Sequence, residues 1–200
     1  MKPLYFAPMN FFGNYVYRHF LLVRGVDYVL SELIQIPIFE KEIKKDKLEV
    51  FPEDIPKTIF QIGASNANEI VGGVKKLKEL IPTIKEINLN MCCPQSSMKQ
   101  KQICGGILYN KDLMEILCVS LENECKKQNI IPSIKIRLGT NKKNIEIKDY
   151  LEIAKKTGIK KVYVHTRPLC YSYNDPAMSE KLTKSQNIIV QKKKVKWFFI

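Results

Sequence analysis

The sequence lacks most features that would assign it to a familiar class at once. No run approaches the ~18 apolar residues of a membrane span, and residues 1–9 hold too short an apolar stretch for a signal peptide. The six cysteines form no C-x-x-C pair, and neither histidine has zinc-finger spacing. We therefore predict a cytoplasmic protein with reduced thiols, no metal site and no disulfide framework.

Several catalytic signatures are missing as well. The chain shows no Ser-His-Asp order, no Walker-type glycine loop, no H-E-x-x-H and no carboxylates at paired spacing. These absences argue against hydrolase, nucleoside-triphosphate and zinc-enzyme functions.

The composition that is present suits one soluble domain. Of 200 residues, 45% are hydrophobic and 26% charged, a balance unlike that of disordered or membrane chains. The formal net charge of +13 favours a polyanionic partner such as nucleic acid. Because most of the excess is lysine scattered among Asn and Ile, biased base composition explains the charge equally well.

Short strand-like runs alternate with amphipathic helical segments. The runs rich in Val, Ile, Tyr or Phe predict strands at residues 4–7, 28–31, 58–62, 86–89, 133–138 and 161–165. A first helix is predicted after a cap at Ser65 or Asn66, and its apolar face runs from Ile70 to Ile81. A second is predicted over residues 112–127, with Ile116 on its inner stripe, and a third over residues 147–156. Strands joined by helical crossovers predict a parallel sheet.

The residues at the strand ends distinguish two parallel-sheet folds. Periodicity alone fits a doubly wound sheet and a TIM-type (β/α)8 barrel equally. Polar or special residues end nearly every predicted strand: Pro8, Met9, Glu32, Gln61, Asn90, Cys92, Cys93, Lys135, Arg137, His165 and Arg167. In a barrel the carboxyl ends of all strands meet at one mouth, where the active site is built, so this regular placement favours the barrel.

The cysteines alone identify no nucleophile or acid. A thiol in the strand-end loop "NMCCP" (90–94) is able to serve as a proton donor, since such loops are accessible and rigidly held. Free cysteine is also one of the most commonly buried residue types, so spacing alone favours a structural role for any one of the six thiols.

Seven short motifs in order resemble those of the tRNA-dihydrouridine synthases. They are "APM" (7–9), "SEL" (31–33), "FQIGAS" (60–65), "INLNMCCP" (87–94), "GGILYN" (105–110), "SIKIRLG" (133–139) and "VYVHTR" (162–167). The resemblance covers about residues 4–177. It implies a flavin-dependent barrel that reduces uridine in tRNA, with NADPH as reductant and FMN as cofactor.

The resemblance also implies roles for individual residues. Pro8, Met9 and Asn10 would lie along the flavin ring, and Gln61 would hydrogen-bond its polar edge. Lys135 would place positive charge near the pyrimidine portion of the flavin, and His165 would contact the cofactor.

Four further residues are assigned to the substrate by the resemblance. Asn90 would hold the uracil, and Cys93 would be the general acid that gives a proton to one carbon of the double bond. Arg137 and Arg167 would face substrate or phosphate. The target uridine would leave its stack to enter the mouth.

The sequence departs from the family pattern at several places. Cys92 replaces the usual Gly, which would cost about 1 kcal/mol or more if that position needs positive φ. The Asn-Gly-Asp and Gly-Arg motifs of the seventh and eighth strands are absent, as is the C-terminal helical domain. We therefore expect a truncated barrel of about six β/α units in residues 1–177, with residues 178–200 as a divergent Lys-rich tail or an aborted seventh strand. Its open edges predict a partner or self-association.

Two other functions fit the sequence. A dihydroorotate dehydrogenase-like flavin barrel also has an Asn-rich strand end followed by Cys-Pro, although "KIRLG" and "VHTR" favour the tRNA enzyme. A non-catalytic RNA-binding remnant of a broken gene accounts for the missing phosphate-site motifs.

Overall fold

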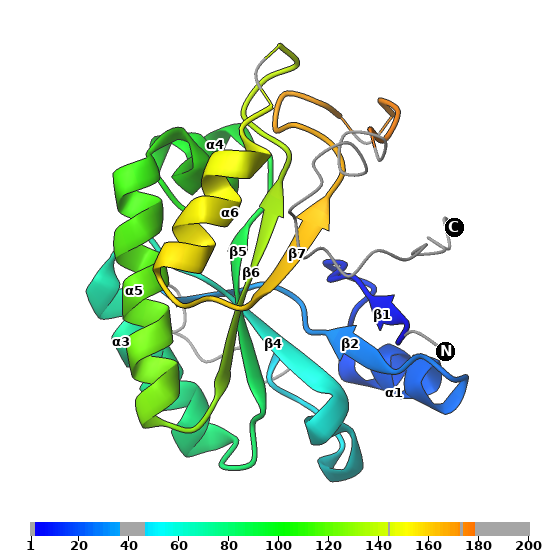
Figure 1. Ribbon diagram of the computed structural model, residues 1–200. Helices are drawn as coiled ribbons and strands as arrows, with labels where there is room; N and C mark the ends of the chain where they lie inside the picture. The colour runs from blue at the N-terminus through cyan, green and yellow to red at the C-terminus, as the bar shows by residue number, and fades with distance from the viewer. Residues whose placement is uncertain (1–2, 37–46, 144, 173, 179–200) are drawn as a thin grey trace.

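A computed structural model describes residues 3–36, 47–143, 145–172 and 174–178. Its strands form one parallel sheet in the order β1-β2-β4-β5-β6-β7, with β3 beside β4 on the same edge as β2 (Figure 1). The strands are β1 (Tyr5–Phe6), β2 (Tyr28–Leu30), β3 (Ile34–Gln35), β4 (Thr58–Gly63), β5 (Glu86–Met91), β6 (Ile131–Arg137) and β7 (Lys161–His165). Six strand positions in chain order, curled into a half barrel, confirm the incomplete (β/α) barrel.

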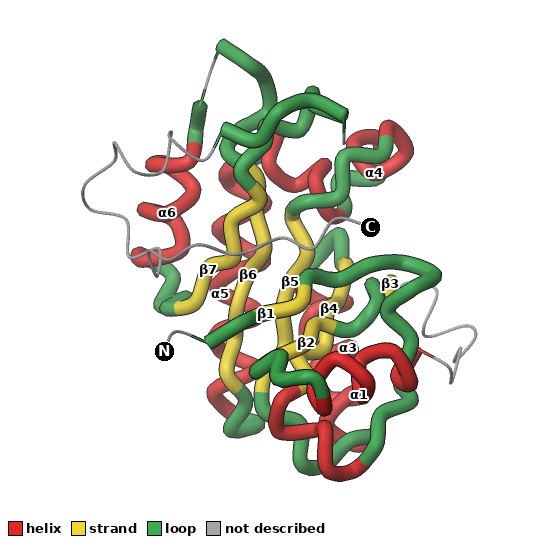
Figure 2. The backbone as a smooth tube through the Cα atoms, turned by 90° about the vertical axis from the view of Figure 1, so that its right-hand side faces the viewer, coloured by secondary structure: helices red, strands yellow, loops and turns green. Residues whose placement is uncertain are grey.

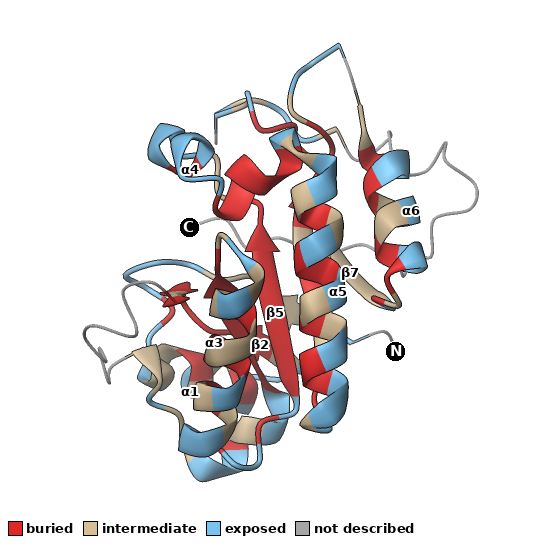
Figure 3. Cartoon of the chain, turned by 90° about the vertical axis from the view of Figure 1, so that its left-hand side faces the viewer, coloured by how far each residue is buried: buried red, intermediate tan, exposed pale blue. Residues whose placement is uncertain are grey.

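The helices follow the strands in alternation. The α-helices are α1 (Tyr15–Val23), α3 (Ala67–Leu80), α4 (Ser96–Gln100), α5 (Lys111–Lys127) and α6 (Ile147–Lys156), and two 3₁₀ turns are η2 (Pro52–Lys57) and η3 (Cys104–Tyr109). Figure 3 shows α3 and α5 on the viewer's side of β5. Figure 2 shows the sheet from the opposite side. Helices on one face only exclude a doubly wound sheet for the described residues.

Alternation along the strands separates an apolar outer face from a polar inner face. The outward residues, among them Phe60, Leu89 and Ile136, join the buried cluster with Val74, Leu77 and other residues of the helices. The inward residues between them are Gln61, Asn88, Asn90, Ser133, Lys135 and Arg137. The hydrophobic core therefore lies between the sheet and its helices, and the inner face presents polar and charged side chains.

The second strand position is interrupted by one extra residue. Leu30 pairs with Ile59, but Ile34 pairs with Ile62, so four residues on one side match three on the other. The Ser31 hydroxyl replaces a backbone acceptor at the interruption, since it accepts a hydrogen bond of 2.9 Å from the Gln61 amide. This bulge turns Glu32 to the mouth side of the sheet.

A charged and aromatic cluster joins the two ends of the curled sheet at the opposite, amino-terminal end of the strands. The buried Glu86 carboxylate accepts hydrogen bonds from Lys161 at 2.6 Å and from the Tyr163 hydroxyl at 2.9 Å. Tyr5 of β1 stacks on Tyr28 at 4.9 Å and meets Tyr163 edge-on at 5.6 Å. Burial and the Glu86 charge raise the pKa of Tyr163, which keeps its hydroxyl a donor.

Most predicted elements are confirmed, with two corrections. Residues 147–156 and 161–165 form α6 and β7 with the predicted bounds, and Asn66 caps α3 by accepting from the Glu69 amide. Helix α1 was not predicted. Ile116, predicted for the inner stripe of α5, is instead exposed, and that stripe includes Met114 and Cys118. The predicted tail at 178–200 lies outside the described residues except for Met178.

Candidate active site

Four neighbouring strands bring their polar inner residues together at one mouth. The registers pair Gln61 with Asn88, Asn90 with Lys135, and Arg137 with His165. Because all four strands are parallel, these residues lie toward the same carboxyl ends. The structure therefore brings together the predicted site residues of β4 to β7.

A chain of buried amides fixes the floor of the mouth. Gln61 Nε2 donates to Asn88 Oδ1 at 2.8 Å, and Asn90 Nδ2 donates to Gln61 Oε1 at 2.7 Å. Asn88 in turn donates to the Ser133 hydroxyl at 2.9 Å. Asn88 and Ser133 were not predicted as site residues, although Asn88 stands in the quoted "INLN" motif. A network connected in this way holds each amide in one orientation.

The side chain of Asn90 also folds the loop that carries the cysteines. Its Oδ1 accepts hydrogen bonds from the backbone amides of Cys92 at 2.8 Å and Cys93 at 3.1 Å. An asparagine that bonds the backbone two residues onward forms an Asx turn, which sets the direction of the chain after the strand. The described hydrogen bonds thus use both acceptor positions of the oxygen and one of the two side-chain N–H groups of Asn90.

Cys93 lies partly exposed on this loop. Its carbonyl accepts from the Gly105 amide at 3.2 Å, and its side chain packs against a small cluster of Leu33, Met98, Ile103 and Cys104. A Cβ on Gly105 would approach the Cys93 carbonyl oxygen to 2.2 Å, so only glycine allows this contact. The turn η3 therefore presses directly against the backbone of Cys93.

The remaining cysteines have other surroundings. Cys104, Cys118 and Cys125 are fully buried, and burial raises the pKa of all three thiols, to about 12 for Cys118 and Cys125. Cys170 is exposed in a turn beyond β7. Inert packing is the ordinary role of thiols buried in this way.

Cys92 turns its thiol toward the inner face. Lys135 Nζ donates to Cys92 Sγ at 2.9 Å, and Arg137 Nε donates to the Cys92 carbonyl at 2.9 Å. Cys92 does not belong to the described non-glycine residues with positive φ. The backbone strain considered for a side chain at this position is therefore absent, and the thiol instead adds a partner for Lys135.

The two predicted arginines are both buried, and both donate to carbonyls of the loop backbone. Arg137 is buried and donates from Nη1 to the carbonyls of Pro168 at 2.9 Å and Tyr171 at 3.3 Å. Arg167 donates from Nε to the Asp175 carbonyl at 2.6 Å. Both guanidinium groups thus fasten the loop after β7 to the mouth.

His165 is neutral in this environment. Burial, followed by the charges of Lys135, Arg137 and Arg167, lowers the pKa of His165 to about 3. The Arg167 guanidinium lies 3.2 Å from His165 Nε2 and has only N–H groups to offer, so Nε2 accepts and the ring proton is on Nδ1.

The predicted residues Pro8, Met9 and Asn10 lie in the loop that follows β1. Gly13 N donates to the Met9 carbonyl at 2.8 Å, and the Phe11 amide donates to the buried Glu32 carboxylate of the neighbouring strand position. The buried Arg18 guanidinium donates to the carbonyls of Gly13 and Glu49.

Glu32 and Arg18 both hold the backbone of the loop after β1, and neither was given a role from the sequence. The signals were present, because Glu32 follows a predicted strand within the "SEL" motif. Burial, opposed by the charges of Glu32 and Asp54, lowers the pKa of Arg18 to about 10, so the side chain stays protonated at neutral pH.

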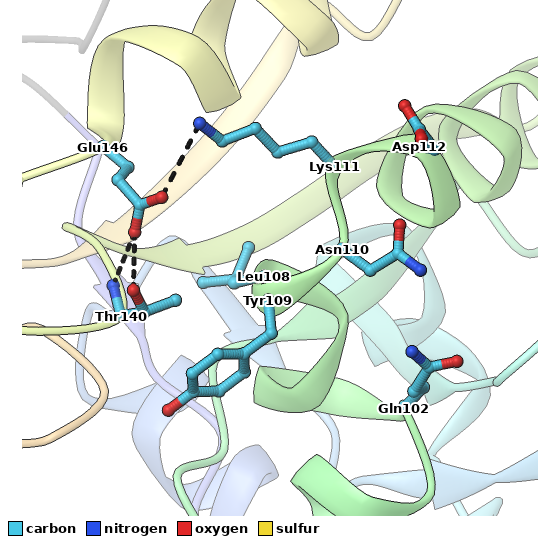
Figure 4. Close-up of a pocket in the computed structure, with 8 residues that line it drawn as sticks. All are labelled: Gln102, Leu108, Tyr109, Asn110, Lys111, Asp112, Thr140 and Glu146. Carbon is cyan, nitrogen blue, oxygen red and sulfur yellow. Dashed lines mark hydrogen bonds and ion pairs between the residues drawn. The ribbon is translucent and has the colours of Figure 1, made fainter.

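A separate cavity of about 490 Å³ lies outside the mouth (Figure 4). It lies between the start of α5 and the loop that leads to α6, and its lining residues are Gln102, Leu108, Tyr109, Asn110, Lys111, Asp112, Thr140 and Glu146. Glu146 accepts from the Thr140 amide and hydroxyl at 3.0 and 2.7 Å, which ties the loop to α6. No predicted site residue lines this cavity.

Two features are absent from the described residues. No group of three or more His, Cys, Asp or Glu side chains is placed to hold a metal ion among them. No described helix combines the length and apolar character needed to cross a membrane.

The fold and the mouth define a class: a curled parallel β/α sheet with amide, thiol and cationic groups at the carboxyl ends of its strands. The family model described as "Dihydrouridine synthase (Dus)" matches residues 5–197, and the chain belongs to this family.

Similar curated proteins carry the same name. The chain is 29% identical over 136 residues to a tRNA-dihydrouridine(47) synthase (NAD(P)(+)) of Vanderwaltozyma polyspora and 27% identical to that of Saccharomyces cerevisiae, in each case over 67% of this chain and 20% of the relative. It is 24% identical to a probable tRNA-dihydrouridine synthase of Rickettsia bellii over 86% of this chain and 52% of the relative. The chain thus spans between a fifth and about half of the length of these relatives.

Proposed function

We propose that the chain takes part in the FMN-dependent reduction of uridine to 5,6-dihydrouridine in tRNA, with NADPH as reductant and Cys93 as general acid. Its family and the names of its curated relatives, which include NAD(P), support the reaction and the class of reductant. The proposal for Cys93 rests on its place in the "NMCCP" loop and on the backbone turn that Asn90 makes there.

The observation that carries the assignment is the turn made by Asn90. One side-chain oxygen bonds the amides of Cys92 and Cys93, while the same side chain is anchored to Gln61. This turn fixes the backbone of Cys93, a partly exposed residue, just after the asparagine whose second side-chain N–H would bind the uracil. A uracil bound by that N–H would need a proton donor within reach, and Cys93 is the partly exposed thiol of this loop.

The donor set of the inner face fits a flavin. Gln61 keeps one N–H and one lone pair after its bonds to Asn88 and Asn90, and Lys135 keeps two N–H groups after its bond to Cys92. These are the groups that would hold the polar edge of the ring, beside the loop of Pro8, Met9 and Asn10. FMN would supply the hydride chemistry that side chains lack.

The protein's own residues would provide binding and the proton. The Asn90 N–H would bind a uracil carbonyl, and the Cys93 thiol would place its proton on one carbon of the former double bond, next to the carbon that receives hydride. The resulting thiolate would regain a proton from solvent, which the exposure of Cys93 permits. Arg137 would act through the backbone of Cys92, to which it is bonded.

His165 would serve as a neutral hydrogen-bonding group at the cofactor. Its lowered pKa excludes a cationic role at neutral pH, and its tautomer is fixed by Arg167. Positive charge near the flavin would therefore come from Lys135 and not from the imidazole. Arg167, with its guanidinium against His165, would support this orientation.

The test is to purify the chain, add FMN, and measure both flavin binding and dihydrouridine in an unmodified tRNA transcript. NADPH-dependent dihydrouridine formation is expected, and parallel reactions with NADH give the coenzyme preference. A folded chain that binds tRNA but no flavin would instead support the RNA-binding alternative. Activity on free dihydroorotate would support the dehydrogenase alternative.

A further inference from the structure

The loop after β1 holds an aromatic residue in an unusual conformation. Phe11 has φ 72°, in the left-handed region that favours glycine, and its side chain is 92% exposed. A non-glycine residue there costs about 1–2 kcal/mol. No described contact of the ring offsets this cost, because an exposed ring gains almost nothing from burial.

The conformation of Phe11 is held from three directions. Its amide donates to the buried Glu32 carboxylate, the Gly13 amide closes the turn onto the Met9 carbonyl, and the Arg18 guanidinium fixes the Gly13 carbonyl. A Cβ on Gly13 would come within 2.7 Å of the Met9 carbonyl oxygen, so the turn is already as tight as glycine allows. The exposed ring thus stands on a rigid turn.

The turn lies on the rim of the mouth. It directly follows Met9 and Asn10 at the carboxyl end of β1, and Glu32 follows the carboxyl end of β2. The next residue, Phe12, is also exposed, at 66%. Two exposed aromatic residues therefore lie in the loop at the carboxyl end of β1, the side of the sheet that carries the mouth.

From this geometry we infer that Phe11 is a stacking platform for an unpaired base of the RNA substrate, outside the reacting uridine. The inference rests on the proposed function. Aromatic rings bind unpaired bases by stacking, at about 1–3 kcal/mol per base. The net charge of +13 favours a polyanion over a neutral protein surface as the occupant.

The test compares Phe11→Gly and Phe11→Trp with the wild-type chain in binding a fluorescently labelled tRNA transcript. Phe11→Gly weakens tRNA affinity roughly 5- to 160-fold, the fold-change that one lost stacked base corresponds to. Its melting temperature does not fall, because glycine accepts the backbone conformation without strain. Phe11→Trp retains the affinity.

A matched control removes another exposed ring. Phe20 lies on α1, where the Arg24 guanidinium covers its ring at 5.2 Å, and Phe20→Ala leaves tRNA affinity unchanged. Binding of heparin, a polyanion without bases, is the same for wild type and Phe11→Gly, since charge is not altered.

Three results would overturn the inference. Equal tRNA affinity of wild type and Phe11→Gly removes the platform but leaves the proposed function intact. A wild-type dimer that becomes a monomer in Phe11→Gly assigns the ring to a second copy of the chain. A wild-type chain with no affinity for tRNA overturns both the platform and the proposed function.

Discussion

At the scale of single residues, the mouth depends on side chains whose hydrogen-bonding capacity is almost fully used. The Asn90 side chain donates one hydrogen bond to Gln61 and accepts two, from the backbone amides of Cys92 and Cys93. The described hydrogen bonds leave one side-chain donor of Asn90 unused, and we propose that this donor binds a carbonyl group of the uracil. Under the proposed function, the specificity of the mouth would come from the few donors that the internal hydrogen bonds leave unused.

His165 predicts a pH dependence of stability. Its pKa of about 3 in the folded chain lies below the ordinary value of 6.5, so the unfolded chain binds the proton more readily. The stabilising contribution is complete above pH ~6.5 and is lost as pH falls toward 3, with a slope of up to about 1.4 kcal/mol per pH unit. Urea unfolding of wild type and His165→Asn between pH 3 and 8 measures this difference.

Comparison of the two chains is needed because other groups titrate in the same range. Hydrogen bonds from Thr140 and Tyr150 and the charge of Lys111 outweigh burial and lower the pKa of Glu146, which also destabilises the fold in acid. The His165→Asn chain keeps that contribution and should lose only the part due to the imidazole. Parallel stability profiles for the two chains would show that His165 titrates normally in the folded state.

At the scale of elements, the loop after β5 and the turn η3 form one unit. The contact between Gly105 and the Cys93 carbonyl leaves no room for a side chain. Gly105→Ala should therefore move Cys93, reduce stability by about 1–3 kcal/mol and lower dihydrouridine formation at least tenfold. Thermal unfolding and the tRNA assay measure the two effects.

Gly25→Ala provides the matched control. Gly25 has φ 94° with no atom within 4 Å of an added Cβ, and it lies between α1 and β2, away from the mouth. Alanine there should cost about 1 kcal/mol through the backbone while leaving turnover unchanged. If the two alanines reduced turnover equally, lost stability and not a displaced Cys93 would be the cause.

At the scale of the whole molecule, the cluster around Glu86 holds the curl of the sheet. Lys161 bonds the buried Glu86 and lies 5.3 Å from the centre of the Tyr5 ring, so it links β5 and β7 to β1. Lys161→Met keeps the length of the side chain but leaves the Glu86 carboxylate without its cation. We expect unfolding free energy to fall by about 1–3 kcal/mol in urea.

The control for that substitution is a surface pair. Lys156 bonds Glu115 at 2.7 Å with its side chain 70% exposed, and Lys156→Met should cost less than about 1 kcal/mol. Equal losses for the two variants would mean that the Glu86 cluster contributes no more than a solvated ion pair.

The sequence predicts most helices and strands well, because local sequence patterns indicate where they form. Residues 147–165 show a helical pattern followed by a strand pattern, and Asn66 is a recognisable helix cap. Helix α1 escaped prediction because Val16, Phe20 and Val23 are apolar yet exposed, which obscures the buried stripe. Its buried face is centred on Arg18 and Leu22, and an arginine gives no apolar signal.

The candidate site is only partly predictable for a different reason. The strand-end residues are visible in order, but their partners are distant in sequence. The bond between Lys135 and Cys92 joins residues 43 apart, and Ser31 replaces a backbone acceptor for Gln61, 30 residues away. Such pairings depend on register and on a bulge, which short-range patterns do not encode.

The most direct test of the central claim is the amount of dihydrouridine formed in tRNA by Cys93→Ala, Cys92→Ala and Cys170→Ser beside the wild-type chain, with flavin binding measured for each. We predict that Cys93→Ala loses about 10²–10⁴-fold in rate while it still binds FMN, and that exposed Cys170 is dispensable. Full activity in Cys93→Ala together with its loss in Cys92→Ala would contradict the account.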